Sequence, residues 1–234
     1  MISNRPLLRV KDLEISYYHK PIVQNISFEL FAGEMVAITG PSGCGKSVTA
    51  HAMVGMLGDR WKVTKGQMIY NDQIINFLDE KEWQRFRRKE ISLLIQESLN
   101  GLNPIRTVKK QMVETLRLRQ KWKSKELEEY LHSLLDQVGF SHPNLILSSY
   151  PFELSGGMRQ RILLAMMVSM KPKILIADEP TTALDAINRE KVMTLLKKLQ
   201  KDYQLTILLI SHDQQSINKY ANRIIQMNAG GVIS

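Results

Sequence analysis

A glycine-rich segment, Gly40–Ser47 with the sequence GPSGCGKS, most constrains what this chain can fold into. It follows a short apolar run, Met35–Thr39, and precedes a sequence that predicts a helix beginning at Lys46. Glycines allow the backbone to curl so that its amides, together with the positive end of the helix dipole, surround a phosphate group. This succession of strand, loop and helix therefore predicts a nucleotide-binding P-loop.

Two side chains of this loop are expected to act on the nucleotide. The Lys46 ammonium would neutralise the β- and γ-phosphates of ATP, and the Ser47 hydroxyl would bind Mg²⁺. Cys44 is the single cysteine of the chain, so it cannot form an internal disulfide, and we expect it to pack inside while its backbone amide stays available. The predicted ATP-binding residues of the loop are Gly40, Pro41, Ser42, Gly43, Cys44, Gly45, Lys46, Ser47 and Val48.

The segment ILIADEP, Ile174–Pro180, supplies the apolar residues of a buried strand followed by two carboxylates. In open α/β sheets, ligands bind outside the carboxyl ends of the strands. Asp178 is therefore placed to hold Mg²⁺ through water, and Glu179 to polarise the water that attacks ATP. An acidic pair after a strand is commonly a solvated turn, and it is the upstream P-loop that favours the catalytic interpretation.

The order of the predicted elements favours an α/β fold with a mostly parallel sheet core, because strands and helices alternate in the last third of the chain. These elements are Ile174–Ala177, Ala186–Lys201, Thr206–Ile210 and Gln214–Tyr220. Upstream we predict strands at Leu8–Val10, Ile22–Leu30, Met35–Thr39 and Ile91–Ile95, an antiparallel hairpin in Met68–Ile75, and helices from Asp79, near Val108–Arg119, at Ser124–Val138 and from Ser155 to about Met170. We expect one domain, residues 1–234, with a helical subdomain inserted at about 97–171.

Charge and hydropathy limit the kinds of partner and the location that we expect for the protein. The formal net charge is +9, and the cations are scattered, which favours a solvated face first and a contribution from a membrane surface second. They lack the aromatic interleaving of a single-strand nucleic-acid groove, so no nucleic-acid partner is expected. The first residues lack the apolar core of a signal peptide, and no apolar run reaches the roughly 18 residues of a membrane span.

A third motif is LSGGMRQR, Leu154–Arg161, in which Ser155 can cap a helix while two glycines expose amides at its positive end. A second anion-binding helix start, in a chain that already has one for its nucleotide, calls for an explanation. At this point the chain resembles the ABC ATPase family, whose signature sequence is matched at LSGG and at the following glutamine. The resemblance covers essentially the whole chain and implies the P-loop NTPase fold of an ABC cassette.

The resemblance also assigns residues that would otherwise be unremarkable. Gln96 in LLIQES matches the glutamine that senses Mg²⁺ and the γ-phosphate. His212 in LLISHD matches the switch histidine, a catalytic residue together with Glu179, and Tyr17 matches the aromatic that stacks on adenine, with Tyr18 as its rival. The implied Mg²⁺ set is Ser47, Gln96 and Asp178; the signature residues acting on a partner's nucleotide are Ser155, Gly156, Gly157 and Gln160; and Asp185 belongs to the D-loop.

In this family two cassettes pair head to tail under two membrane permease subunits, so the resemblance implies a peripheral protein on the cytoplasmic face of the membrane. The strings YPFELSGGMRQR and ADEPTTALD, with Asn103-Pro104, are most similar to importers of oligopeptides and nickel, which are fed by an extracellular or periplasmic binding protein. Nickel or a metal chelate is slightly preferred over oligopeptides. A paralogous ATPase partner is favoured over a homodimer, and the alternative function is a cytosolic ABC ATPase acting on nucleic acid or ribosomes.

Overall fold

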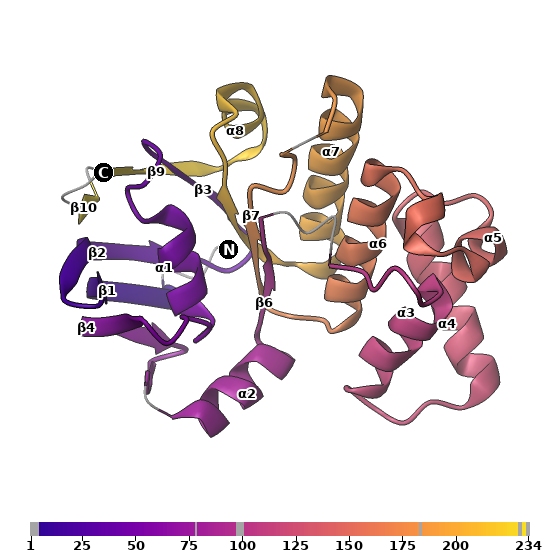
Figure 1. The fold of residues 1–234 in the computed structure, drawn as a ribbon, viewed down its shortest axis with the longest axis horizontal. Coiled ribbons are helices and arrows are strands. Elements are labelled where there is room, and N and C mark those ends of the chain that lie inside the picture. The colour runs from indigo at the N-terminus through magenta and orange to yellow at the C-terminus, as the bar shows by residue number, and fades with distance from the viewer. Residues whose placement is uncertain (1–4, 78, 97–100, 183, 229–230, 233–234) are drawn as a thin grey trace.

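The computed structural model describes residues 5–77, 79–96, 101–182, 184–228 and 231–232, arranged around two β-sheets (Figure 1). The strands are β1 (Leu8–Tyr17), β2 (Lys20–Leu30), β3 (Met35–Thr39), β4 (Trp61–Tyr70), β5 (Gln73–Ile75), β6 (Ile91–Leu94), β7 (Ile174–Asp178), β8 (Thr206–Ile210), β9 (Arg223–Asn228) and β10 (Gly231–Val232). The helices are α1 (Lys46–Met53), α2 (Glu80–Lys89), α3 (Val108–Arg117), α4 (Ser124–Gln137), α5 (Pro143–Ser148), α6 (Gly156–Ser169), α7 (Ala186–Tyr203) and α8 (Gln214–Tyr220), with a short 3-10 helix at Pro151–Glu153.

The larger sheet has the strand order β10-β9-β3-β8-β7-β6, and its strands from β9 to β6 are parallel. Its central strands are buried on both faces, which is why they read as continuous apolar runs. Ile174 and Ile176 of β7 join the core that contains α1, whereas Leu175 and Ala177 join the core that contains α6 and α7. The first turns of α1 and α6 therefore lie on opposite faces of one sheet. The predicted α/β fold is confirmed.

The smaller sheet is antiparallel, with the order β2-β1-β4-β5. Its β4–β5 hairpin turns at Asn71 and Asp72, whose φ angles of 47° and 62° are those that a tight two-residue hairpin loop requires. Asn and Asp tolerate this conformation better than other residues with side chains. The predicted antiparallel hairpin is therefore confirmed, beside the parallel sheet as expected.

Helices α3 to α6 lie together at one end of the molecule (Figure 1). Apolar residues at helical spacing hold them, as in α4, where Leu127, Leu131 and Leu134 are buried in the same core as α6 and α7. The helices predicted here are confirmed in type, and α6 begins after Ser155 as expected. The boundary of a helical subdomain at about residue 97 falls outside the described residues and stays a prediction.

Several parts of the fold differ from the sequence prediction, among them β4, which begins at Trp61 instead of Met68. Strand β1 runs to Tyr17 instead of ending at Val10, because a bulge at Asp12, with φ of 49°, breaks the alternation that the prediction relied on. Helix α5 and strands β9 and β10 were not predicted, since each is short and lacks a clear period. Across the described residues, no helix combines the length and apolar character that a bilayer crossing requires.

Candidate nucleotide site

The P-loop connects β3 to α1 and is shaped by close backbone approaches. A Cβ atom on Gly40 would lie 2.1 Å from the Met227 carbonyl oxygen, and one on Gly45 would lie 2.4 Å from Val23 Cγ2. Helix α1 begins with Gly45 as its N-cap, and no side chain accepts a hydrogen bond from its first amides. These amides are the groups that a phosphate binds at a helix start. The loop therefore has the shape that its sequence predicts.

Two glycines of this loop allow a matched test of that shape. Gly43 has φ of 80° with open space around its Cβ position, whereas Gly45 has φ of 100° and the Val23 contact. We expect Gly43→Ala to lower the free energy of unfolding by about 1 kcal/mol through strain alone, and Gly45→Ala by about 3 kcal/mol, because overpacking is added. Urea unfolding of both variants checks this. Equal decreases in the free energy of unfolding would show that Val23 of β2 does not restrict the space at Gly45.

The P-loop side chains reach both the loop and the acidic strand. Lys46 Nζ donates to the carbonyl oxygens of Gly40 and Pro41 at 2.8 and 2.9 Å, which holds the ammonium across the mouth of the loop. Ser47 Oγ donates to Asp178 Oδ1 at 3.1 Å, which joins α1 to the end of β7. Cys44 is buried, as its packing interpretation requires. The lysine thus folds back on the loop, whereas the hydroxyl reaches the acidic strand.

Asp178, the last residue of β7, is fully buried. Burial raises the pKa of its carboxyl above the ordinary value, while the hydrogen bond from Ser47 and the nearby His51 oppose that rise. Its Oδ2 atom has no hydrogen-bond partner among the described residues. A buried carboxylate oxygen without a partner is costly, and a hydrated divalent cation beside the Ser47 hydroxyl would satisfy it. The donor set therefore fits Mg²⁺, which prefers oxygen ligands and retains water.

Glu179 follows at once and is held from three sides. Its backbone has φ of 50° and donates a hydrogen bond to the Ile210 carbonyl at 2.9 Å. His212 Nδ1 lies 3.0 Å from Glu179 Oε1 and 2.9 Å from Oε2, and Thr182 Oγ1 donates to Oε2 at 3.0 Å. The carboxylate is thus fixed at the carboxyl ends of β7 and β8. Thr182 was not among the predicted site residues, and only its position three residues after Glu179 could have indicated it.

Gln96 and the two candidate tyrosines border the site from other elements. Gln96 lies two residues beyond β6, exposed, at the edge where β7 ends, because Leu94 pairs with Ala177 in parallel register. Tyr17 ends β1 and packs at 4.8 Å from the Trp61 ring, a neighbour that sequence reasoning missed. Tyr18 is 56% exposed, and its ring meets that of Tyr17 edge to face at 4.9 Å, so the choice between the two tyrosines stays open.

The signature segment forms the start of α6. Ser155 is its N-cap and accepts a hydrogen bond from the Met158 amide at 3.3 Å, as predicted. Gly157 lies against α7, where a Cβ would come within 3.0 Å of Asn188 Oδ1. Asn188 in turn donates from its backbone and its side chain to Asp185, which links the signature to the D-loop. Gln160 is buried in the first turns of α6.

The P-loop and the signature are not brought together within this chain. Figure 1 draws α1 and α6 on opposite sides of β6 and β7, in agreement with the two separate cores. The acidic strand and His212, by contrast, meet at one edge of the sheet, with Ser47 joined to the same strand. The P-loop, the acidic strand and His212 thus form one cluster of candidate site residues, and the signature forms a separate helix start at Ser155.

Comparisons with known proteins agree with this geometry. A family model described as ABC transporter matches residues 23–182. The chain is 37% identical to the metal-staphylopine import system ATP-binding protein CntD of Staphylococcus aureus, over 97% of this chain and 84% of that protein. It is 38% identical to the oligopeptide transport ATP-binding protein AppD of Bacillus subtilis, over 97% and 71%.

Solved structures agree as well. The fold is similar to the dimeric post-hydrolysis state of the ATP-binding cassette MJ0796 bound to ADP and Pi, with a TM-score of 0.82, 28% identity and 97% of both chains covered. The family match, these identities and the geometry of the P-loop and the acidic strand together show that the chain belongs to the ABC transporter family, as an ATP-binding and ATP-hydrolysing subunit.

Proposed function

We propose that the chain energises an importer of metal chelates or oligopeptides from the cytoplasmic face of a membrane. Support comes from the relatives, which are named as ATP-binding proteins for the import of metal-staphylopine and the transport of oligopeptides or dipeptides. The sequence slightly favoured nickel or a metal chelate; a metal-chelate importer is among these relatives, and none of them is named for nickel. The alternative of a nucleic-acid ATPase is not favoured, since these relatives are named for transport.

The observation that carries the proposal is the meeting of Ser47, Asp178 and Glu179 at one sheet edge. In the proposed roles, Lys46 neutralises the phosphates, and Ser47, Asp178 and Gln96 hold Mg²⁺ directly or through water. When bound, Mg²⁺ would neutralise developing charge on the phosphate oxygens. Glu179, held by His212 and Thr182, orients and polarises the attacking water.

The position of the signature supports pairing with a second cassette. Ser155 caps a helix whose positive end has no P-loop near it in the same chain, because α1 and α6 pack on opposite faces of the sheet. We propose that Ser155, Gly156, Gly157 and Gln160 complete the site on a partner's P-loop. We favour a paralogous partner.

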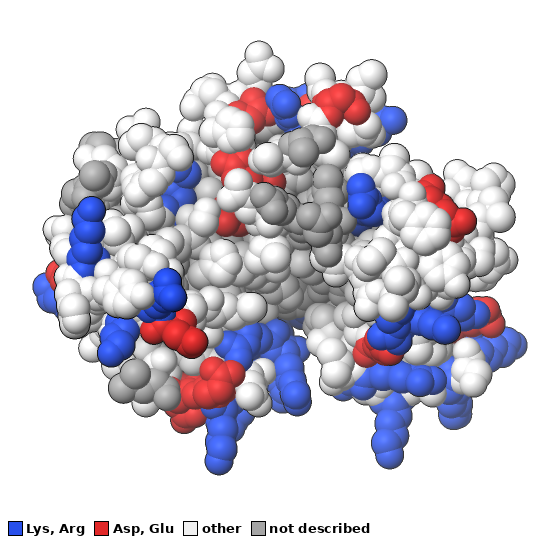
Figure 2. Space-filling view, in the orientation of Figure 1, with Lys and Arg blue, Asp and Glu red and all other residues white. Residues whose placement is uncertain are grey.

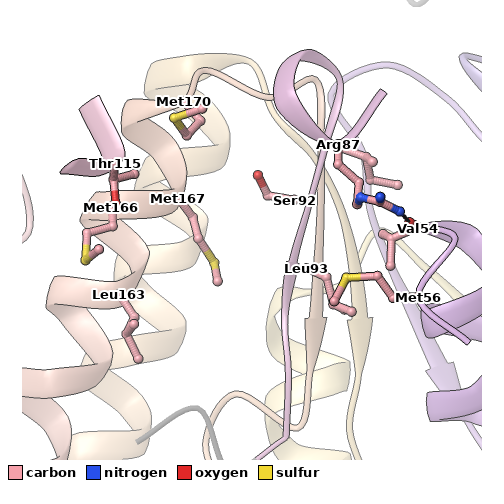
Figure 3. Close-up of a pocket in the computed structure, with 11 residues that line it drawn as sticks. Val54, Met56, Arg87, Ser92, Leu93, Thr115, Leu163, Met166, Met167 and Met170 are labelled. Atoms are coloured by element: carbon pink, nitrogen blue, oxygen red, sulfur yellow. Dashed lines mark hydrogen bonds between the residues drawn. The ribbon is translucent and has the colours of Figure 1, made fainter. Parts of the chain in front are cut away.

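An apolar groove of about 310 Å³ is the site at which we propose that a permease docks (Figure 3). Four methionines line it, Met56, Met166, Met167 and Met170, together with residues of β6 and with Arg87 and Thr115. Methionine adapts its shape to a partner. Because β6 lines the groove and leads directly to Gln96, a permease segment seated there would be coupled to the nucleotide site. We call this the docking groove.

The test is the ATPase rate of this chain in vesicles that contain a candidate permease pair, with a binding protein loaded with either a metal chelate or an oligopeptide. We expect one cargo to stimulate turnover at least tenfold. Met56→Asp, which places a charge on a groove residue that is 53% exposed, should abolish the stimulation. Leu145→Asp, 66% exposed on α5, is the control and should retain it. Turnover that no permease changes would contradict an importer role.

A further inference from the structure

Six cations lie on the two segments of the chain that flank the docking groove, and we call them the basic face. They are Arg85, Arg88 and Lys89 on α2, and Arg117, Arg119 and Lys121 at and just beyond the end of α3. All six are exposed. Figure 2 shows blue side chains that project from the lower edge of the molecule on both sides of a notch, over α2 and over α3 and α4.

The two halves of the basic face belong to one surface. Arg87 on α2 and Thr115 on α3 line the same groove from opposite sides (Figure 3), so the two helices that carry or lead to the cations flank it. Arg119 Nη1 also donates to the Ser169 carbonyl at 3.4 Å, beside the groove residue Met170. The apolar groove therefore lies between two segments of the chain that carry three exposed cations each.

Acidic partners are scarce around these cations, although the pKa of the Glu114 carboxyl is lowered by the Arg106 hydrogen bond and further by the charge of Arg117. Within the described ranges, none of the six takes part in a salt bridge, whereas Arg87 pairs with Glu80 and Arg106 with Glu114 close by. The helix dipole accounts for cations in the last turn of α2. It does not account for the cations of the connection 118–123, which is not helical.

That connection is held in place and carries an exposed apolar residue. Trp122 Nε1 donates to the Leu116 carbonyl at 3.2 Å, and its ring stacks on Tyr130 at 4.9 Å. Leu118, between two arginines, is 67% exposed. Phosphate groups surround cations, and acyl chains receive an apolar side chain, at the surface of an anionic bilayer. A protein partner would instead be expected to supply carboxylates, and nucleic acid would meet no exposed aromatic ring here.

We propose that the basic face binds the anionic phospholipid headgroups of a bilayer on both sides of the docking groove. The lipid contact goes beyond the proposed function, which supplies only the expectation that this side faces a membrane. In an assembled transporter, the groove would receive the permease while the six cations contact the lipid around it.

The experiment is co-sedimentation of the full chain with vesicles, without permease or ATP, so its result does not depend on the importer assignment. Binding to vesicles made of equal parts of phosphatidylcholine and phosphatidylglycerol is compared with binding to vesicles of pure phosphatidylcholine. Each cation near an anionic surface strengthens binding by about fivefold. We therefore expect the triple variant Arg85→Gln, Arg88→Gln and Lys121→Gln to bind the anionic vesicles at least tenfold more weakly.

The matched control removes three exposed cations elsewhere, Lys11→Gln, Lys62→Gln and Lys191→Gln, on β1, β4 and α7. It has the same net charge as the test variant and should bind as the parent does, within about twofold. If both variants bind the anionic vesicles equally weakly, only the net charge of the protein determines binding. If the parent binds both vesicle types equally, the headgroup charge does not contribute to binding. If the test variant keeps vesicle binding but loses stimulation by the permease, the face contacts protein. Each of these outcomes overturns the proposal.

Discussion

Glu179→Gln is expected to bind Mg-ATP with an affinity within about twofold of the parent and to hydrolyse it at least a hundredfold more slowly. A positioned general base contributes about 10² to 10⁴ in rate, and the amide has the same shape but cannot accept the proton. Because His212 and Thr182 hold the carboxylate in place, the glutamine can keep one of these bonds. Nucleotide binding by fluorescence and phosphate release in the assembled transporter would separate the two steps.

The control for this experiment is Thr182→Val, which removes the hydrogen bond to Oε2 and leaves the carboxylate. It should lower turnover by no more than about tenfold, since the histidine contact remains. Lys46→Ala should show the opposite pattern, with ATP affinity lost first. The lysine charge is proposed to act on the nucleotide already in the bound state, so removing it should weaken ATP binding. Full turnover by Glu179→Gln would show that this carboxylate is not the base.

The sequence was sufficient to predict the positions of those candidate site residues that lie within one motif. Gly40–Ser47 could be placed because a phosphate-binding loop needs small residues between a buried strand and a helix, and both flanks were readable. Asp178 and Glu179 follow a run of four apolar residues, so the edge of the sheet at which they lie was also predictable. The parallel core followed from the alternation of strands with helices.

The contacts between motifs could not be read in the same way. Nothing in the local sequence indicates that Trp61 packs on Tyr17, because the pairing of β1 with β4 joins residues far apart in the chain. The same holds for Asn188, which fills the space that Gly157 leaves. Strand β9 was missed because its place is set by pairing with β3, and six residues carry too little periodicity to show it.

The link from Gly157 through Asn188 to Asp185 bears on how two half-sites communicate. The signature is proposed to act on a partner's nucleotide, and Asp185 is the N-cap of α7. Asn188 contacts both within one chain. If the signature acts as proposed, Asn188 is a candidate link between the start of α6 and Asp185, and Asn188→Ala would test whether the two half-sites are coupled through it.

Ser155→Arg is expected to abolish turnover at the site that this chain completes on its partner. The arginine removes the helix cap, costing about 1 kcal/mol, and it places a bulky cation where two glycines would approach a phosphate. At the positive end of α6 that charge is also unfavourable. Sites that still turn over can be counted in the assembled transporter. With a paralogous partner, one of two sites should remain active, whereas a homodimer should lose both.

Ser155→Asn is the matched control, because asparagine caps a helix about as well as serine and adds no charge. It should unfold at the same urea concentration as the parent, so the effect of arginine on turnover can be separated from its effect on folding. Two sites still active with Ser155→Arg would contradict the proposed action of the signature on a partner. An active transporter that contains this chain as its only ATPase would exclude the paralogous pairing but not the proposed half-sites, since the P-loop and the signature are both on this chain.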